Sequence, residues 1–423
     1  MVRTSKASSA RVKELTRALA TMRFVTSFAF GCGGTVRILH LDVLDLNVTT
    51  IGAIMAAYSL MIAIVEVPSG AVSDVWGRRK TKLLASWVMA GAYLILASAS
   101  GLVDVLVSAA LLGTGRALYS GAADAWFVDE VGDAKSPAVL AGFAKSEAAH
   151  NIGFAAGSLT GAFLPQLTSG TLPDRLVFAP VFALGAAMLL VDLVLTLRVM
   201  VENRKPHHMP LGGVYRTTIA GIANALDSSI PRWTAVSMVV VGGSVACTEL
   251  LTPLGLAEGV GTERALLFFG PLVAGSWGFS AVASLLTNRV ESAAGSLQRA
   301  SGLSMVVLAL AVLPAALEAW YMPVVAYVTV TFVLGALLPL LAASLHGHVR
   351  SANRATAASV LNLSMMLGAA GGSVLVGALE GLSVVVVAIG GAIAASALVL
   401  SPSIRTETDA VANLNEEPVA SQK

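Results

Sequence analysis

Residues 70–83 read GAVSDVWGRRKTKL, and they join two long apolar stretches of the sequence. Gly70 and Gly77 carry no side chain, so they allow two helices to pack closely and the chain to turn tightly between them. Asp74 stands where the first apolar stretch ends, and Arg78 follows four residues later, a spacing at which the carboxylate and the guanidinium can pair. The pattern predicts a tight, basic connection between two helices at a membrane surface.

The composition extends this prediction to the whole chain. Of the 423 residues, 56% are hydrophobic and only 12% are charged, and the mean hydropathy is +0.79. An ordinary soluble domain has about 25% charged residues, and a disordered chain has low hydrophobicity, so both classes are excluded. The apolar stretches are continuous rather than alternating, which argues against a β-barrel. The net charge of +2 gives no basic patch for nucleic acid.

Twelve apolar segments are long enough to cross a bilayer, since a transmembrane helix needs about 20 residues. They cover 19–38, 51–73, 83–100, 103–125, 141–164, 177–198, 234–255, 265–286, 299–317, 322–345, 355–378 and 382–401. The sequence therefore predicts an all-α membrane protein. We expect a six-helix bundle over 1–198, a cytoplasmic linker over 199–233, a second six-helix bundle over 234–402 and a cytoplasmic tail over 403–423.

The basic residues of the loops predict the orientation. If the N-terminus is cytoplasmic, the outer loops contain only Arg175 and Arg264, and the other loop Lys and Arg residues lie inside. Such a bias sets the topology of membrane proteins. We expect a multi-pass protein of the plasma or inner membrane with both termini in the cytoplasm.

The pattern G-x-x-x-D-x-x-G-R-R-K closely resembles the signature loop of the major facilitator superfamily, and it stands between the second and third spans, as in that family. The resemblance implies two pseudo-symmetric bundles, a substrate cavity near the midplane and alternating access. It also implies that the acid and first arginine of the loop pair with an acid at the inner end of span four, where Asp124 stands. The expected inner gate comprises Gly70, Asp74, Gly77, Arg78, Arg79 and Asp124.

Two weaker patterns resemble motifs of proton antiporters. Arg116, within residues 113–121, resembles the arginine motif of span four, but the usual glutamine is missing. Gly153, Gly157 and Gly161 resemble the glycine-rich motif of span five, without its Gly-Pro pair. Small residues at every fourth position also occur wherever membrane helices pack closely, so the glycines leave both explanations open.

Charged residues inside the predicted spans are candidates for function, because an ionisable group in hydrocarbon costs several kcal/mol. Arg116 lies near the middle of span four and must pair or face water. Arg37 is either functional or reaches the outer surface with its long side chain. Glu66 lies about 10 Å from the inner boundary of span two, and Glu249 lies in span seven, which lines the pore in this family.

From these positions we expect Glu66 and Glu249 to bind the coupling proton, and Arg37, Arg116 and Glu249 to line the substrate cavity. Asp192 lies near the inner end of span six, where we expect it to be solvated.

Few polar groups in an apolar wall favour proton-coupled efflux of small amphipathic, drug-like or antibiotic-like compounds, the multidrug-resistance type. The alternative is a proton-coupled importer of a small nutrient or metabolite. A membrane scaffold or sensor is a third possibility, without an appended domain to support it. The sequence contains no P-loop, hydrolase pattern or metal-ligand spacing. We therefore expect no enzyme activity, no cofactor and no metal. The expected partners of this monomer are a small-molecule substrate, protons and the lipid bilayer, and no nucleic acid.

Overall fold

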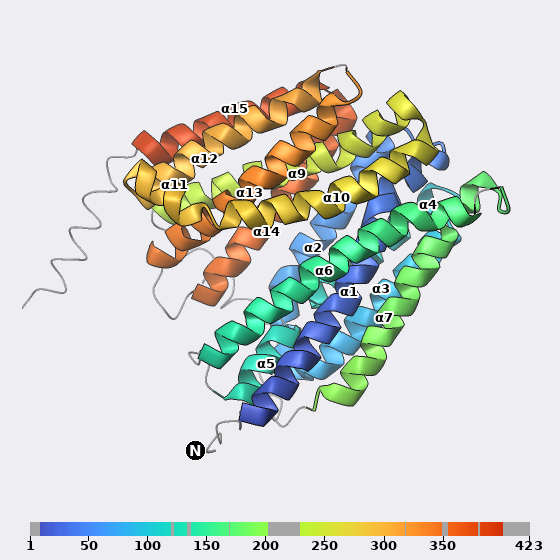
Figure 1. The fold of residues 1–423 in the computed structure, drawn as a ribbon, viewed down its shortest axis with the longest axis horizontal. Helices are drawn as coiled ribbons and strands as arrows, with labels where there is room; N and C mark the ends of the chain where they lie inside the picture. The colour runs from blue at the N-terminus through green and yellow to red at the C-terminus, as the bar shows by residue number, and fades with distance from the viewer. Residues whose placement is uncertain are drawn as a thin grey trace, which may run out of the picture.

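The computed structural model describes residues 9–119, 122–132, 137–168, 170–201, 229–317, 319–348, 354–379 and 381–400. These residues form helices joined by short connections (Figure 1). The first group is α1 (Ser9–Val43), α2 (Val48–Trp76), α3 (Arg78–Ala97), α4 (Leu102–Tyr119), α5 (Ala122–Val131), α6 (Pro137–Thr168) and α7 (Ala179–Val199). The second group is α9 (Ser229–Val260), α10 (Thr262–Ser284), α11 (Thr287–Ala294), α12 (Leu297–Val312), α13 (Met322–His348), α14 (Arg354–Leu379) and α15 (Gly381–Leu400). Short 3₁₀ turns cover Asp174–Leu176 and Leu313–Ala316.

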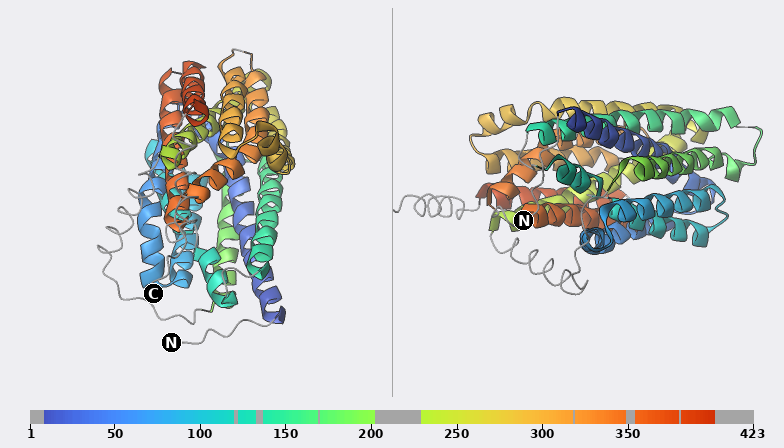
Figure 2. Two further views of the ribbon diagram at one scale, coloured as in Figure 1. Left: turned by 90° about the vertical axis from the view of Figure 1, so that its left-hand side faces the viewer. Right: turned by 90° about the horizontal axis from the view of Figure 1, so that it is seen from below.

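Each group forms one half of the molecule, and most helices within a half run side by side (Figures 1 and 2). Nine segments of the described chain are long and apolar enough to cross a membrane, and one of them combines α4 with α5. The helices α3, α6 and α15 occupy the remaining three predicted spans. The all-helical membrane fold is therefore confirmed. Most of the predicted linker and the whole predicted tail lie outside the described residues.

The connection between α2 and α3 is tighter than the sequence predicts. Helix α2 continues to Trp76 and α3 begins at Arg78, so Gly77 alone separates them. Gly77 has φ of 99°, a conformation that residues with a side chain rarely adopt. Asp74 lies in the last turn of α2, but its side chain is outside the described part of the structure.

In each half, glycines bring the first helix into backbone contact with a later helix. A Cβ on Gly157 of α6 would clash with the carbonyl oxygen of Phe28 in α1. A Cβ on Gly242 of α9 would clash in the same way with the carbonyl oxygen of Met365 in α14. The glycines of α6 are therefore helix-packing residues, which is one of the two explanations that their spacing allowed.

The two halves touch at the end of the molecule opposite the α2–α3 connection. There the Thr49 hydroxyl donates to the carbonyl oxygen of Gly377 at 2.5 Å, joining the start of α2 to the end of α14. The Gln166 amide at the end of α6 donates to the carbonyl oxygen of Glu263 in α10 at 3.1 Å. From these contacts the halves diverge towards the end that carries the N-terminus (Figure 1).

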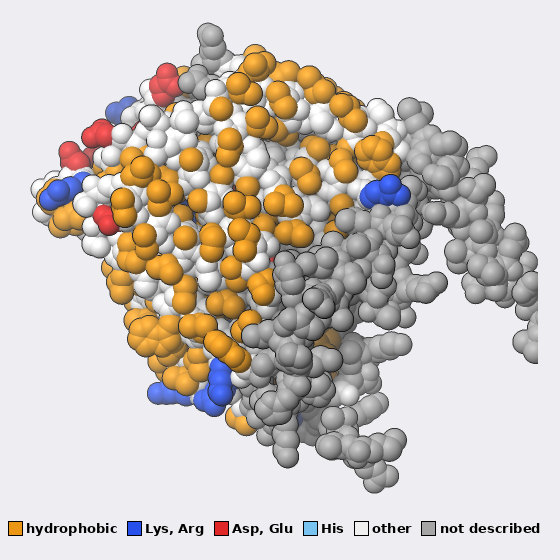
Figure 3. Space-filling view, turned by 180° about the vertical axis from the view of Figure 1, so that it is seen from behind, with side chains coloured by type: hydrophobic (Ala, Val, Ile, Leu, Met, Phe, Trp, Pro, Cys, Tyr) orange, Lys and Arg blue, Asp and Glu red, His pale blue; other side chains and the backbone are white. Residues whose placement is uncertain are grey.

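The outer surface is that of a membrane protein. Large apolar side chains such as Leu167, Leu285 and Trp87 are exposed, with 79%, 79% and 61% of their surface accessible. Hydrophobic side chains cover the face drawn in Figure 3, and the charged side chains visible there lie mainly towards its edges. This distribution places the apolar belt against lipid and the charges near the two membrane surfaces.

Candidate substrate-binding site

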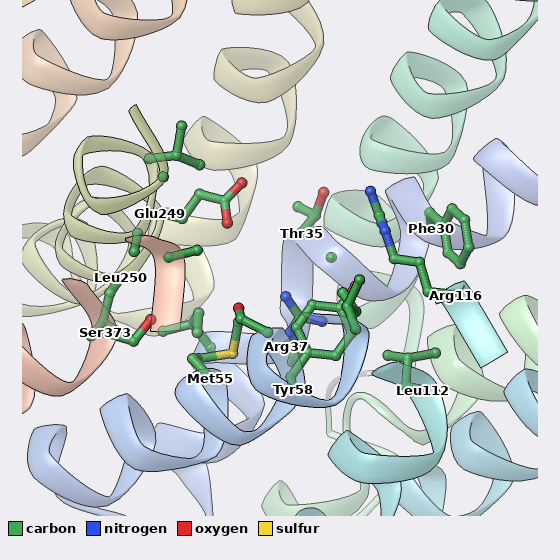
Figure 4. Close-up of a pocket in the computed structure, with 18 of the residues that line it drawn as sticks. Phe30, Thr35, Arg37, Met55, Tyr58, Leu112, Arg116, Glu249, Leu250 and Ser373 are labelled. Carbon is green, nitrogen blue, oxygen red and sulfur yellow. The ribbon is translucent and has the colours of Figure 1, made fainter. Parts of the chain in front are cut away.

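A cavity of ≈ 200 Å³ lies between the two halves (Figure 4). Helices α1, α2, α3, α4 and α6 line it from one half, and α9, α10, α13 and α14 line it from the other. Ligand cavities of proteins typically measure about 300–1,000 Å³, so this one suits a small molecule. Its position between the halves is where a rocking motion would expose it to either side in turn.

Three described residues of the cavity wall are charged, namely Arg37, Arg116 and Glu249. The side chains of Arg116 and Glu249 are exposed, although both helices run through the interior, because they face the cavity. In Figure 4, Glu249 lies on one side of the cavity and Arg116 on the other, with Arg37 close to Tyr58. The structure thus brings together the three residues that we expect to line the substrate cavity.

Each arginine lies over an aromatic ring. The Arg37 guanidinium carbon is 4.8 Å from the centre of the Tyr58 ring, and that of Arg116 is 5.1 Å from the centre of the Phe30 ring. Arg116 is also within hydrogen-bonding reach of the Tyr58 side chain. Cation–π contacts of this kind stabilise a guanidinium that has lost part of its hydration. The aromatic rings therefore hold both cations in the cavity wall.

Glu249 faces these cations from α9, in the other half. It interacts electrostatically with Arg37 and Arg116 and, on its own side, with Tyr327. Among the described residues, no salt bridge joins Glu249 to either arginine. The carboxylate is therefore free of a fixed partner and accessible from the cavity.

The second predicted proton-binding acid, Glu66, lies elsewhere. It is a half-buried residue of α2 and is not among the described residues that line the cavity. In the part of the chain that the structure describes, no cluster of three His, Cys, Asp or Glu could hold a metal ion. Glu249 is thus the acid that a substrate in the cavity would meet.

A protein family known for two helical halves with a cavity between them matches this sequence. The model of the Major Facilitator Superfamily matches residues 19–373. The chain belongs to the major facilitator superfamily. It is therefore a multi-pass secondary transporter rather than an enzyme, and members of this superfamily bind small-molecule substrates and often protons. No curated protein sequence matches the chain.

Solved structures with the same fold include transporters of different substrates. The structure of a mutant of the nucleoside transporter NupG has a TM-score of 0.72 at 12% identity, covering 91% of this chain and 99% of that one. A POT family transporter in complex with 5-aminolevulinic acid has a TM-score of 0.68 at 16% identity, covering 92% and 96%. The POT family transporter PepTSo has a TM-score of 0.72 at 11% identity, covering 92% and 97%. At these identities the likeness establishes the fold alone.

Two residues of the expected inner gate, Arg78 and Asp124, have other described partners than the predicted ones. Arg78 pairs with Asp129 and donates to the carbonyl oxygen of Ala125. Asp124 instead accepts from Arg23 of α1 at 2.5 Å. The expected Arg78–Asp124 pair is therefore wrong. The reason is that Asp124 and Asp129 lie on different faces of α5, so that Asp129 meets the start of α3 while Asp124 meets α1.

Arg79 has a capping role in the structure. Its guanidinium donates to the carbonyl oxygen of Leu197 at 2.7 Å, in the last turn of α7. Carbonyl groups at a helix end lack partners within the helix, and a basic side chain satisfies one of them. The loop thus fastens α7 as well as α5 to the start of α3.

The structure contains a buried ion pair between α3 and α7 that the sequence does not predict. Lys82 donates to Asp192 at 2.5 Å, both side chains have no exposed surface, and Ser86 donates to the same carboxylate oxygen at 2.8 Å. The Lys82 ammonium also lies 4.6 Å from the centre of the Tyr119 ring. The expectation of a solvated Asp192 is therefore wrong, because α3 supplies a cation at the same depth.

Proposed function

We propose that the protein imports a small polar metabolite together with protons, the alternative that the sequence left open. The observation that supports this proposal is the charge of the cavity. Two arginines and one glutamate, Arg37, Arg116 and Glu249, give its described wall a net charge of +1 when Glu249 is ionised. Protonation of Glu249 increases this charge to +2.

This change of charge couples the proton to the substrate. A cavity of higher positive charge binds an anionic group more tightly, and by reciprocity the bound anion favours the protonated form of Glu249. Proton and substrate then occupy the cavity together, as symport requires. In an antiporter they would have to displace each other.

Two further observations support a polar substrate. The cavity of ≈ 200 Å³ is small for an amphipathic drug. The similar structures include transporters named for nucleosides or peptides, in agreement with a nutrient rather than a drug. The glycines of α6, which resemble an antiporter motif, are accounted for by packing against α1.

The signature-loop residues belong to the gating part of the proposal. We place the α2–α3 connection on the cytoplasmic side, as the loop charges predict, so that the halves joined at the opposite end represent an inward-facing state. Gly70, Asp74, Gly77 and Arg78 would then stabilise the bundle end that closes in the outward-facing state. Glu66, which the sequence also indicated for proton binding, becomes the reserve candidate.

Transport by the purified protein in liposomes tests the direction and the coupling. Labelled organic acids, nucleosides and dipeptides would be offered with an inward proton gradient, with no gradient and with an outward gradient. We expect accumulation of at least one polar compound with the inward gradient alone. Glu249→Gln should abolish accumulation but keep exchange, while Glu258→Gln, an exposed acid of the same helix, should accumulate like the parent. Substrate extrusion against a proton flow would instead support efflux.

A further inference from the structure

Tyr58 of α2 interacts with both arginines of the cavity. Its ring faces the Arg37 guanidinium at 4.8 Å, and its side chain is within hydrogen-bonding reach of Arg116. Arg37 comes from α1 and Arg116 from α4, so α2 stands between their helices. Three separate helices of one half therefore converge on this tyrosine.

The cation–π contacts leave N–H donors of the arginines available. A guanidinium placed over an aromatic ring meets the ring with its charge and keeps N–H groups for other partners. The Nε atom of Arg37 is buried and has no hydrogen-bond partner. Arg116 rests on Phe30 and its side chain is exposed to the cavity. Both arginines therefore line the cavity, and Arg37 keeps one donor without a partner.

Two neighbouring guanidinium groups repel each other, so an empty pair of this kind is costly unless a third group holds it. Tyr58 is placed to do so, with its ring under Arg37 and its side chain within hydrogen-bonding reach of Arg116, and Glu249 lies across the cavity without forming a salt bridge. An oxyanion with two or more oxygen atoms would complete the arrangement, because forked donors match carboxylate and phosphate geometry.

We infer that Tyr58 is a positioning residue that holds Arg37 and Arg116 as a single subsite for a carboxylate or phosphate group of the substrate. The inference rests on the proposed function in assuming that this cavity binds the substrate. It adds the substrate class, a small organic anion, and the residue that selects for it. Recognition of the anionic group belongs to one half of the transporter, and Glu249 in the other half remains available to the proton.

Binding to the full-length protein in detergent tests the inference without any gradient. The probes are two matched pairs: succinate with its neutral diamide, and glycerol 3-phosphate with glycerol. Dissociation constants would be measured by calorimetry or by the shift in thermal unfolding. We expect succinate or glycerol 3-phosphate to bind at least tenfold more tightly than its neutral partner, and the pair that shows the difference identifies the oxyanion.

Substitutions of Tyr58 separate positioning from a merely structural role. Tyr58→Phe keeps the ring under Arg37 and removes the contact with Arg116, so anion affinity should fall about fivefold. Tyr58→Leu removes both contacts and should lower it about thirtyfold. Affinity for the neutral partners should stay within twofold in both variants. Tyr321→Phe, an exposed tyrosine outside the cavity, is the matched control and should bind as the parent does.

Two results would overturn the inference. One is equal binding of the charged and neutral probes by the parent protein. The other is that Tyr58→Leu, folded as judged by its elution and unfolding temperature, binds anions and neutral compounds with unchanged selectivity. Failure of the proposed function would look different, since anion selectivity would persist while binding took up no protons and an inward gradient drove no accumulation.

Discussion

The two halves share one scaffold but differ in their interior charges. In both, glycines press the first helix of the half against its fifth span, α1 against α6 and α9 against α14. The ion pairs of Arg23, Arg78 and Lys82 belong to the N-terminal half, and that half also supplies both arginines of the cavity. Among the described cavity residues that come from the C-terminal half, Glu249 alone is charged. Helix packing therefore follows the pseudo-symmetry of the two halves, whereas the cations and the acid of the cavity come from different halves.

The division has a mechanical consequence. If each half moves as a unit, the contacts of Arg37 and Arg116 with Tyr58 persist, while the separation between these arginines and Glu249 changes. The free energy of ionising a carboxylate in such a cavity depends strongly on its distance to cations. The acid is therefore placed where rocking of the halves can change its protonation.

The buried pair Lys82–Asp192 should give the largest effect on stability. Asp192→Asn or Lys82→Met alone leaves a buried charge without its partner, which costs about 3–5 kcal/mol. The double variant Lys82→Met with Asp192→Leu removes both charges and should recover most of that loss. The free energy of unfolding, measured in detergent for the parent, the single variants and the double variant, gives the difference. A double variant as unstable as the single ones would show that the N-terminal half needs this charge pair for its fold.

Arg116 should give the next largest effect, on binding. Arg116→Ala should weaken binding of an anionic probe about a hundredfold, because a charge-assisted contact is lost and the subsite is broken. Arg116→Lys should recover only part of the affinity, since an ammonium lacks the planar fork. Glu249→Gln, in the other half, should still bind the anion. Equal losses from Arg116→Ala and Glu249→Gln would contradict the division between the halves.

The glycine contacts test whether the halves are mechanically alike. Gly157→Ala and Gly242→Ala should each destabilise the protein by about 1–3 kcal/mol through overpacking, because each added Cβ meets a backbone oxygen. Gly91→Ala is the control, since a Cβ there meets nothing within 4 Å. If only one of the two substitutions lowers the free energy of unfolding, the similar packing of the two halves does not give them similar stability.

The pair Arg23–Asp124 should give the smallest effect. Its side chains are 23% and 33% exposed, so solvent screens the interaction and Asp124→Asn should cost about 1 kcal/mol at most. The more informative readout is the accessibility of cysteines placed at the end of the halves near the α2–α3 connection. Unchanged labelling and normal transport would remove Asp124 from the gate.

The elements that depend on local pattern could be predicted from the sequence. The apolar segments indicated the all-helical fold, and residues 70–83 indicated the turn at Gly77, because a single glycine and a charge cluster suffice to define it. The depth of Arg116 in its span indicated that it either pairs or faces water, and in the structure its exposed side chain lines the cavity. What could not be predicted depends on how distant helices are rotated. Lys82 and Asp192 are 110 residues apart, and nothing near either of them indicates that they share one buried site.

The pairing of Asp124 failed for the same reason. Its partner depends on how α5 is rotated about its axis, which turns Asp124 towards α1 and Asp129 towards α3, and the apolar pattern does not reveal this rotation. The role of Tyr58 was also missed, since a tyrosine in an apolar span carries no signal of its own. Only the convergence of three helices makes it a contact for both arginines.

Proton exchange on substrate binding, followed with a pH indicator in weakly buffered detergent solution, tests proton symport through Glu249. The probe is the anion, succinate or glycerol 3-phosphate, that binds more tightly than its neutral partner, and the signal is corrected with a buffer blank. Because a bound anion favours the protonated carboxyl, we expect the parent protein to take up protons when the anion binds, and Glu249→Gln to take up none. Release of protons by the parent, or unchanged uptake by Glu249→Gln, would contradict the proposed mechanism.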